Sequence, residues 1–276
     1  MKIFRKASEL EPNLVSIKDK GQSIGLVLTM GNLHDGHLSL IREAQLHNEF
    51  VICSIFINPT QFNNENDFNS YPKTIDKDIS KLENIGCNVL FLPEVQEIYP
   101  KGLAKKKIVN NFRNILCDKF RPGHFDGVTT VVDLFFNMIK PTNSYFGEKD
   151  FQQVKIIQDL VKINHHNIKI IQCPSVRDKT GMSLSSRNSK FSNDQLKIFN
   201  VLGNKIKEHI NLLAQNEINN LDQLKIEFLQ NNINKIDYLE IRNENNLEIT
   251  KNYSEARLFI ALYIGDIRII DNFKLY

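Results

Sequence analysis

Short apolar runs alternate with segments of helical periodicity in the first half of the sequence. Apolar residues dominate Ile24 to Thr29 and Phe50 to Ile57, and between them, from His37 to Asn48, they recur at steps of three residues. Continuous apolar runs are typical of parallel strands covered on both faces, whereas recurrence at three residues marks one face of a helix. This pattern predicts a βαβ unit.

The same alternation continues to residue 173. The predicted helices are Thr74 to Gly86, Val128 to Ile139 and Phe151 to Asn164, and the predicted strands are Asn88 to Leu92, Ser144 to Gly147 and Ile168 to Cys173. Together, these elements predict an α/β fold with a doubly wound, parallel, Rossmann-like sheet and right-handed crossovers.

The chain changes character after Pro174, where the polar stretch RDKTGMSLSSRN has few apolar residues. Such a stretch favours a boundary between domains. Beyond it, the pattern predicts helices at Asp194 to Asn216 and Leu221 to Asn232, and strands at Asp237 to Arg242, Leu258 to Tyr263 and Ile267 to Asp271. We therefore expect a Rossmann-like domain over residues 1–175 and a smaller α+β C-terminal domain over residues 176–276.

Composition narrows the class of protein. The chain has 276 residues and a formal charge of +3, from 35 basic and 32 acidic residues. This balance disfavours a nucleic acid or a membrane surface as the partner, and suits a small anionic substrate. The apolar runs are far shorter than the roughly 20 residues of a membrane span, and the N-terminus does not resemble a secretory signal. We expect a soluble, cytoplasmic protein.

The cysteines point to the same compartment. Cys53, Cys87, Cys117 and Cys173 lie far apart, without a C-x-x-C pair or clustered histidines. This spacing argues against a zinc site and against a disulfide framework. We predict reduced, mostly buried thiols.

The stretch TMGNLHDGH, from Thr29 to His37, joins a predicted strand to a predicted helix. Ligands of open α/β sheets bind at such junctions, and the N–H groups and dipole of the helix favour an anion. Gly31 and Gly36 permit a tight turn, and His34 and His37 lie one helical turn apart. Both imidazoles could donate hydrogen bonds to one phosphate chain and stabilise its developing charge. The alternatives are a surface turn or a metal site, although the pair lacks a third ligand and the Glu of H-E-x-x-H.

The longer stretch TMGNLHDGHLSLIREA resembles the nucleotide-binding motif of the pantothenate synthetase (pantoate-β-alanine ligase) family. This family belongs to the nucleotidyltransferase superfamily and shares the HxGH signature with class I aminoacyl-tRNA synthetases. The resemblance continues along the whole chain in the motifs SIFINPTQF, YPKT, RPGHFDGVTTVV, FGEKDFQQ, LSSRN, YLEIR and IRIIDN. One departure is Leu28, where the family usually has proline, which loosens the entry to the loop without removing a functional side chain.

The resemblance implies an ATP-dependent ligation in two steps. The carboxylate of (R)-pantoate attacks the α-phosphate of ATP to give pantoyl-adenylate and pyrophosphate, and the amine of β-alanine then attacks the acyl carbon and expels AMP. ATP is thus expected as a substrate, with Mg2+ bound mainly through its phosphates. The expected partners are small molecules only, without nucleic acid or membrane, and the family generally forms homodimers.

The resemblance also implies which residues form the site. It assigns His37, His34 and Lys149 to catalysis, Gln61 and Gln153 to pantoate, and Gln61 also to β-alanine. An amide suits hydroxylated substrates because it both donates and accepts hydrogen bonds. The residues implied for ATP are Met30, Gly31, Asn32, Leu33, His34, Asp35, Gly36, His37, Gly147, Glu148, Lys149, Asp150, Val176, Leu184, Ser185, Ser186 and Arg187.

Two of these motifs have simpler interpretations when they are taken alone. FGEKD is an ordinary solvated helix start, and LSSRN is a flexible serine-rich linker. Within the family pattern, Lys149 supplies a point charge to the α-phosphate region, and the LSSRN side chains offer hydroxyls and a guanidinium to the triphosphate. Asp150 would hold a ribose hydroxyl or position the lysine, and Val176 would line the adenine side through its backbone. The C-terminal domain would then close as a lid that expels water.

Three residues stay ambiguous at this level. Asp78 is a weak candidate for a magnesium ligand. Arg121 could anchor a subunit interface or approach a substrate carboxylate, and His124 is expected to be a turn residue.

Alternatives to the ligase exist on the same fold. A different nucleotidyltransferase is compatible with the HxGH loop, and a nucleotide-sensing module is the non-enzymatic alternative. An aminoacyl-tRNA synthetase is disfavoured because no basic RNA-binding extension is present.

Overall fold

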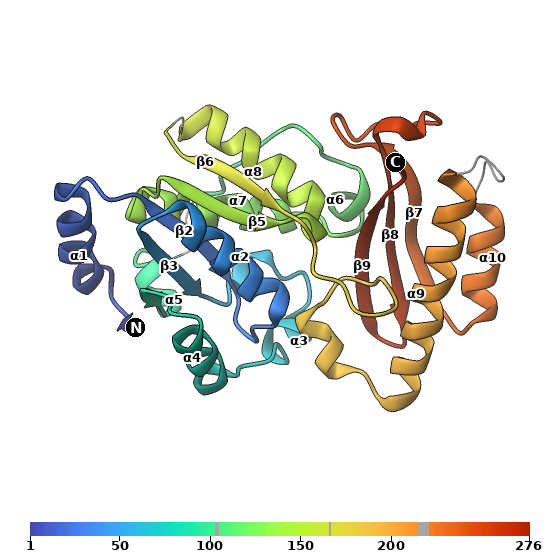
Figure 1. Cartoon of the computed structure of the whole chain (residues 1–276), viewed down its shortest axis with the longest axis horizontal. Helices are drawn as coiled ribbons and strands as arrows, with labels where there is room; N and C mark the ends of the chain where they lie inside the picture. The colour runs from blue at the N-terminus through green and yellow to red at the C-terminus, as the bar shows by residue number, and fades with distance from the viewer. Residues whose placement is uncertain (103–104, 166, 215–220) are drawn as a thin grey trace. The chain divides into compact units, whose positions relative to one another are not determined.

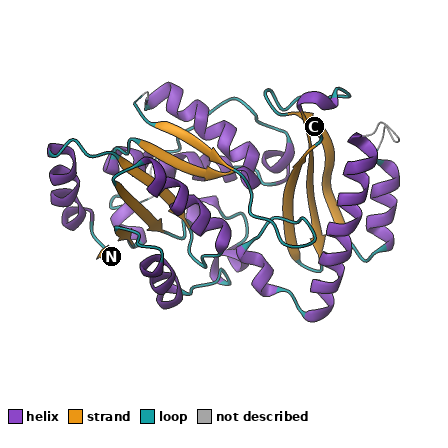
Figure 2. Ribbon diagram, viewed as in Figure 1, coloured by secondary structure: helices purple, strands orange, loops and turns teal. Residues whose placement is uncertain are grey.

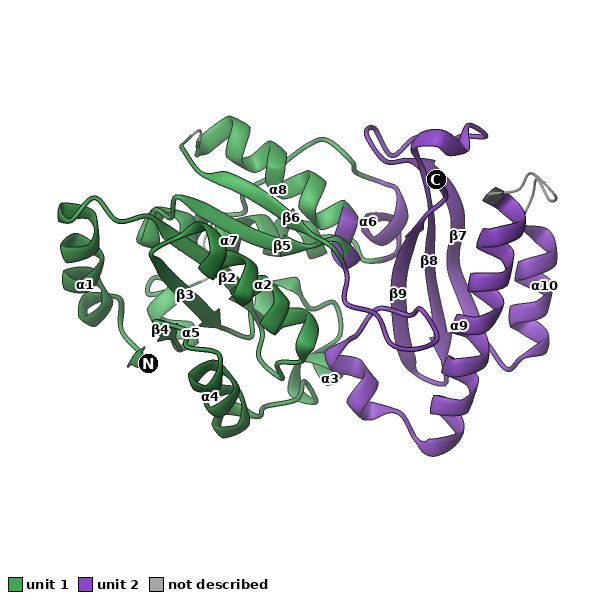
Figure 3. Cartoon of the chain, viewed as in Figure 1, with its two compact units in different colours: residues 1–113, 121–148, 152–174 green, residues 114–120, 149–151, 175–276 purple. Residues whose placement is uncertain are grey.

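The computed structural model describes residues 1–276 except residues 103–104, 166 and 215–220. The chain divides into two compact units (Figure 3). Unit 1 comprises residues 1–113, 121–148 and 152–174, and unit 2 comprises residues 114–120, 149–151 and 175–276. Unit 2 thus includes two short segments that precede residue 175, and a single domain boundary between residues 175 and 176 stays a prediction.

Unit 1 is built on a parallel sheet whose strands, within the described residues, follow the order β1-β4-β3-β2-β5-β6 (Figure 1). The strands are β1 (Lys2–Phe4), β2 (Ile24–Thr29), β3 (Phe50–Ile55), β4 (Val89–Phe91), β5 (Asn143–Gly147) and β6 (Lys169–Cys173). The intervening helices are α1 (Ala7–Asp19), α2 (Asp35–His47), α3 (Glu65–Asn69), α4 (Ile75–Asn84), α5 (Val95–Ile98), α7 (His124–Ile139) and α8 (Phe151–Asn164). The prediction of a doubly wound, Rossmann-like sheet is confirmed.

The order of the strands reverses between β2 and β5, which pair with each other in the sheet. From β2 the chain adds β3 and β4 on one side, and it then returns to add β5 and β6 on the other side. Ligands of doubly wound sheets bind beyond the carboxyl ends of the strands at such a reversal. The segments that follow β2 and β5 both carry predicted site residues, which makes this edge the candidate site of the sheet.

Apolar side chains of the central strands pack on two layers of helices. On one face, Val27 of β2 forms a buried cluster with Ile41 of α2 and Leu82 of α4. On the other face, the ring of Phe91 in β4 meets the ring of Phe135 in α7 edge to face, with 6.0 Å between ring centroids. Burial on both faces explains why these strands are apolar throughout.

Unit 2 contains an antiparallel sheet of β7 (Lys235–Asn243), β8 (Ala256–Ile264) and β9 (Ile267–Lys274), in that order within the described residues. The long helix α9 (Asn193–Ala214) packs on β8, and α10 (Asp222–Gln230) packs on α9 (Figure 2). Leu258 and Ile260 of β8 share one buried cluster with Phe199 and Leu202 of α9. A short helix, α6 (Leu116–Phe120), also contacts β8. The predicted smaller α+β region is confirmed.

Element ends differ from the sequence pattern where turns intervene. Helix α7 begins at His124 rather than at Val128, because Gly123 adopts a φ of +78° and ends the preceding turn at the helix start. The helix predicted from Asp194 to Asn216 is observed as α9 up to Ala214, and the last two predicted residues lie outside the described residues. Neither β1 nor α1 was predicted, since the N-terminal segment mixes charged and apolar residues.

Two general expectations can also be compared with the structure. All four cysteines are free and buried, as predicted. Within the described ranges, no helix is long and apolar enough to cross a bilayer.

Candidate active site

The loop that follows β2 is shaped by one buried carboxylate. Gly31 and Asn32 adopt left-handed backbone conformations, with φ of 84° and 51°. Asp78 of α4, which is fully buried, accepts hydrogen bonds from the backbone N–H of Asn32 (2.9 Å) and of Leu33 (2.8 Å). Backbone N–H groups in a buried turn need such partners, and a charged acceptor strengthens the bonds. Asp78 therefore holds the turn that aims the loop at the start of α2.

Helix α4 supports this loop through two further side chains. The hydroxyl of Thr74, which precedes α4, donates to Asp78 Oδ2 over 3.1 Å. The Lys81 ammonium donates to the backbone carbonyl of Leu33. Leu33 itself is 1% exposed, with its side chain in the core of unit 1. Its contacts make Leu33 part of the loop's support, and its contact with ATP stays a prediction.

The two imidazoles are held at the first turn of α2. His34 is the N-cap of the helix, and its Nδ1 accepts from the backbone N–H of Gly36 over 3.1 Å. The Nδ1 of His37 accepts from the backbone N–H of His34 over 3.3 Å. The ring centroids are 4.1 Å apart. Because Nδ1 is the acceptor in both rings, each neutral imidazole carries its proton on Nε2.

This arrangement converts a sequence motif into a pair of donors. Two Nε2–H groups lie at the amino end of a helix, where the dipole already favours an anion. Gly36 leaves room for this ring, because a Cβ there would lie 2.9 Å from Cε1 of His34 and the imidazole would have to shift. Asp35, which lies between His34 and Gly36, is exposed and adds a negative charge to the same helix start. Because a carboxylate repels phosphate, this charge does not support the predicted contact of Asp35 with ATP.

Gln61 lies in a tight turn after β3, the 3-10 helix η1 (Pro59–Gln61). Its side-chain oxygen accepts from Asn58 Nδ2 over 3.1 Å, and its Nε2 lies 3.0 Å from the sulfur of Met30 in the loop after β2. Asn58 is 1% exposed and also accepts from the hydroxyl of Tyr99 over 2.8 Å. The structure therefore brings the Gln61 amide directly against Met30 of the loop after β2, and Asn58, which the sequence pattern did not single out, holds the other end of that amide.

The RPGHF segment holds the backbone of the same turn. The Gln61 carbonyl oxygen lies 2.7 Å from His124 Nδ1 and accepts from Arg121 Nη2 over 3.2 Å. Helix α7 approaches so closely that a Cβ on Gly127 would lie 2.4 Å from the carbonyl oxygen of Thr60. Both side chains therefore support the turn that carries Gln61, and a role of Arg121 at a subunit interface or toward a substrate carboxylate stays a prediction.

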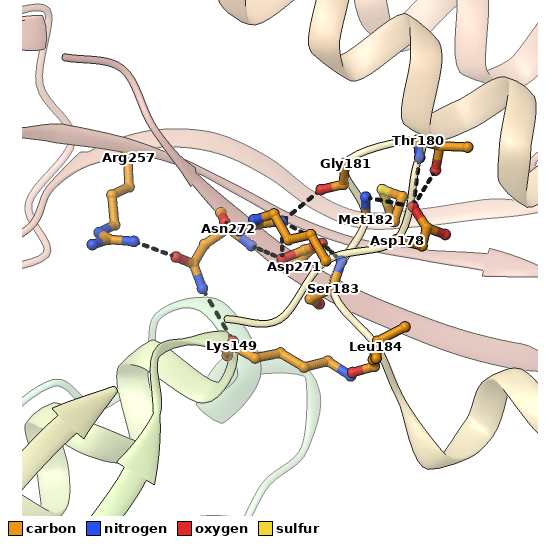
Figure 4. A network of polar contacts seen from close by, with 11 residues as sticks. Lys149, Asp178, Thr180, Gly181, Met182, Ser183, Leu184, Arg257, Asp271 and Asn272 are labelled. Carbon is orange, nitrogen blue, oxygen red and sulfur yellow. Dashed lines mark hydrogen bonds and ion pairs between the residues drawn. The ribbon is translucent and has the colours of Figure 1, made fainter. Parts of the chain in front are cut away.

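Unit 2 contains the second group of predicted residues. Lys149 is partly buried, and its ammonium donates to the backbone carbonyl of Leu184 over 3.1 Å (Figure 4). Burial lowers the pKa of Lys149 from its ordinary value of 10.5, although Asp150 and Asp271 oppose that shift. A lysine in this state gains from any anion that restores its charge. Phosphate binding by Lys149 is compatible with this state and stays a prediction.

The polar stretch after Pro174 is a folded hairpin rather than an unstructured linker. Arg177 and Ser183 form an antiparallel bridge, and the Leu184 N–H donates to the Val176 carbonyl over 2.9 Å. Ser185 then caps the 3-10 helix η3 (Ser186–Lys190) by accepting from the Arg187 N–H over 3.2 Å. The serines and the arginine of LSSRN are therefore held in one turn, and the Val176 carbonyl already has a partner.

The remaining predicted residues lie at strand and helix ends. Gly147 ends β5, and no atom lies within 4 Å of a Cβ built on it. Glu148 accepts from Gln172 over 2.9 Å. Asp150 is exposed, and Gln153 is partly buried on the first turn of α8. Their contacts with ATP and pantoate stay predictions.

A metal site was the weakest expectation. Among the described residues, no group of three or more His, Cys, Asp or Glu side chains could hold a metal ion. Both oxygens of Asp78 accept hydrogen bonds from the loop after β2. Asp78 as a magnesium ligand therefore stays a prediction, whereas its support of the loop is observed.

The sequence does contain a signal for the residues that were missed. Asn58 precedes a proline, and Asn followed by Pro is a typical start of a short helical turn, with the side chain as the cap. Its oxygen indeed accepts from the Thr60 N–H over 3.3 Å. The pairing of His124 with Gln61 has no local signal because 63 positions separate them.

Comparison with known proteins places this geometry in context. The family model for pantoate-beta-alanine ligase matches residues 2–274. A pantothenate synthetase of Acetivibrio thermocellus is 39% identical over 277 residues, covering 99% of this chain and 98% of the relative. A pantothenate synthetase of Francisella tularensis subsp. novicida is 44% identical over 259 residues, covering 92% of this chain and 90% of the relative.

Two solved structures are similar over the whole chain. Pantothenate synthetase from Thermus thermophilus superposes with a TM-score of 0.91 at 33% identity, covering 100% of both chains. Pantoate-beta-alanine ligase from Francisella tularensis, complexed with beta-gamma ATP and beta-alanine, superposes with a TM-score of 0.85 at 39% identity, covering 100% of this chain and 98% of that chain.

The support given by Asp78 can be separated from metal binding. Asp78→Asn keeps the shape but turns an amide N–H toward a loop N–H, which leaves a buried donor without an acceptor and should lower the free energy of unfolding by about 1–3 kcal/mol. Urea denaturation without Mg2+ measures this loss. The control is Asp76→Asn on the exposed side of α4, for which the change should stay within about 0.5 kcal/mol. Unchanged stability together with weakened binding of Mg2+-ATP would instead favour the metal-ligand role.

Proposed function

The chain belongs to the pantoate-beta-alanine ligase family, and we propose that it joins pantoate to β-alanine at the expense of ATP. The proposal rests above all on the paired imidazoles at the start of α2, whose Nδ1 atoms both accept backbone N–H groups. That arrangement directs two Nε2–H donors to an anion. It is the chemistry that a departing pyrophosphate needs.

The first step is formation of a mixed anhydride. A carboxylate oxygen of pantoate attacks the α-phosphorus of ATP, the bond between that phosphorus and the bridging oxygen breaks, and pyrophosphate leaves with the electron pair. His34 and His37 donate to the phosphate oxygens as charge builds up, and Lys149 stabilises the α-phosphate region. Gln61 and Gln153 hold pantoate by its hydroxyls and carboxylate.

The second step releases AMP. The amine of β-alanine attacks the acyl carbon of pantoyl-adenylate, loses a proton and displaces AMP, which completes the amide bond of pantothenate. Gln61 is assigned to both acids, and its held backbone carbonyl suits a residue that must keep one orientation through two steps.

The remaining assignments complete the proposal. ATP would be bound by the loop from Met30 to His37, by Gly147 to Asp150, by Val176 and by Leu184 to Arg187. Mg2+ would arrive on the phosphates. The C-terminal region from residue 176 would act as a lid, and the protein would work as a cytoplasmic homodimer without nucleic acid or membrane partners.

The reaction itself is the first test. With ATP, pantoate and β-alanine, the purified protein should release AMP, pyrophosphate and pantothenate in equal amounts. With pantoate alone, it should exchange labelled pyrophosphate into ATP, because the adenylate forms reversibly. Use of CTP in place of ATP, or exchange in the absence of any carboxylic acid, would exclude this ligase and favour another nucleotidyltransferase.

The role of His37 can be tested with two amide substitutions of matched chemistry. Gln can place its amide nitrogen near the Nε2 position, whereas Asn can accept from the His34 N–H near the Nδ1 position but is too short to bring a donor to the Nε2 position. We expect His37→Asn to lower the rate of pyrophosphate exchange by about 10²–10³-fold and His37→Gln to lower it less, with similar ATP affinity in both. Isothermal calorimetry measures that affinity. Parallel losses of affinity and rate would make His37 a simple binding residue.

The lowered pKa of Lys149 predicts opposite effects of pH on stability and on ATP binding. Between the lowered pKa and 10.5, the folded ligand-free protein has released a proton that the unfolded chain still holds. The free energy of unfolding should therefore rise with pH across this interval, while ATP affinity falls because the ammonium is lost. Lys149→Arg keeps its charge over this interval, so both changes should be absent from the variant and should appear as the difference between the two pH profiles. Equal pH profiles for wild type and Lys149→Arg would contradict the assignment.

A further inference from the structure

Two consecutive residues near the end of β9, Asp271 and Asn272, contact two segments that are far apart in the sequence (Figure 4). They close the IRIIDN motif, to which the proposed chemistry assigns no task. Successive side chains of a strand point to opposite faces of a sheet. Asp271 is paired with Ile260 and Asn272 with Phe259 in the register with β8, so each faces a different layer of unit 2.

Asp271 holds the hairpin that leads into LSSRN. Its Oδ2 accepts from the backbone N–H of Ser183 over 2.7 Å and from Arg177 Nη1 over 3.1 Å. The residue is 3% exposed. Burial raises the pKa of Asp271, and Arg177, the Ser183 N–H and Lys149 oppose that shift. A buried carboxylate with these partners costs folding energy unless they stay in position, which ties the hairpin to β9.

Asn272 holds the segment that carries Lys149. Its Nδ2 donates to the backbone carbonyl of Lys149 over 3.1 Å, and its Oδ1 accepts from Arg257 Nη1 over 2.8 Å. Arg257 in turn stacks on the ring of Phe151, with 4.5 Å between its guanidinium carbon and the ring centroid. Asn272 is 1% exposed, so its amide has little exchange with water. The backbone of Lys149 and the ring of Phe151 are thereby both held by side chains of the sheet.

Two further contacts join the two halves of this network. Arg177 reaches both residues of β9, because its Nη2 donates to the Asn272 carbonyl over 2.6 Å while its Nη1 bonds Asp271. The Lys149 ammonium donates to the carbonyl of Leu184, one residue after the N–H that Asp271 holds. These hydrogen bonds connect the hairpin, β9 and Lys149 to one another. A displacement of the hairpin would therefore displace Lys149 as well.

We propose that Asp271 and Asn272 are positioning residues that set Lys149 and the Leu184 to Arg187 turn at a fixed separation for the ATP phosphates. The inference rests on the proposed function, in which Lys149 and this turn contact ATP. It adds that the spacing is determined on β9, which itself has no contact with substrate in the proposal. Misplacement by about 1 Å is enough to slow an enzymatic step substantially.

The test is a double-mutant cycle between Asn272 and Lys149. Asn272→Asp keeps an acceptor for Arg257 but removes the donor to the Lys149 carbonyl, at nearly constant volume. We expect it to lower pantoate-dependent pyrophosphate exchange about tenfold per folded enzyme in the wild-type background, and less than about twofold in Lys149→Met. Asp271→Asn should likewise lower the exchange rate in the wild-type background and have little effect on it in the Lys149→Met background. If the Asn272→Asp protein does not fold, Asn272→Ala takes its place in the same double-mutant cycle.

The matched control is Arg242→Lys on β7. Arg242 is a buried side chain of the same sheet that donates to Glu240 and to the Leu247 carbonyl; its backbone pairs with Arg257, but neither of these side-chain bonds reaches the network. It should lower the free energy of unfolding while leaving exchange per folded enzyme unchanged in both backgrounds. Tenfold losses by Asn272→Asp with and without Lys149 would overturn the positioning role. An undiminished rate in Lys149→Met alone would instead refute the proposed role of Lys149, and the inference with it.

Discussion

A buried carboxylate that accepts backbone N–H groups is the interaction on which the candidate site of each unit depends. Asp78 in unit 1 holds the N–H groups of Asn32 and Leu33, and Asp271 in unit 2 holds that of Ser183. Loops at the end of strands have N–H groups that the sheet no longer satisfies, and water is absent from a buried turn. A carboxylate repairs this deficit with two strong acceptors, and it defines where the loop lies.

Around these anchors, several observed contacts hold side chains to which the proposed chemistry gives a role. The Gln61 carbonyl receives Arg121 and His124, while the Gln61 amide contacts Asn58. The imidazole of His34 is held by the N–H of Gly36. Catalysis by electrostatic stabilisation requires donors that are already oriented before charge develops, because reorientation during the reaction would cost energy. The dense support is the structural expression of that requirement.

Much of the fold follows from local sequence patterns. The apolar run of β2 and the three-residue recurrence of α2 predicted both elements, and α8 was predicted with the observed ends. The errors are concentrated where local chemistry competes with periodicity. At the N-terminus, charged residues and Pro12 obscure α1, whose apolar residues become buried only against the rest of unit 1. The order of the hairpin after Pro174 has no local signal, because it comes from Asp271, 88 positions away from Ser183.

The sequence by itself determined the fold class, most of the longer helices and strands, the family, and the motifs in which the two histidines, Gln61 and Lys149 occur. The elements follow from residue spacing, because periodicity and helix starts are properties of neighbouring residues, and the family follows from the resemblance of the motifs. Only the tertiary structure decided the tautomer of each imidazole, the support of the Gln61 turn by Arg121 and His124, and the tie between Lys149 and β9. These hydrogen bonds join residues that are tens of positions apart in the sequence. A local sequence pattern does not predict which buried donor meets which acceptor.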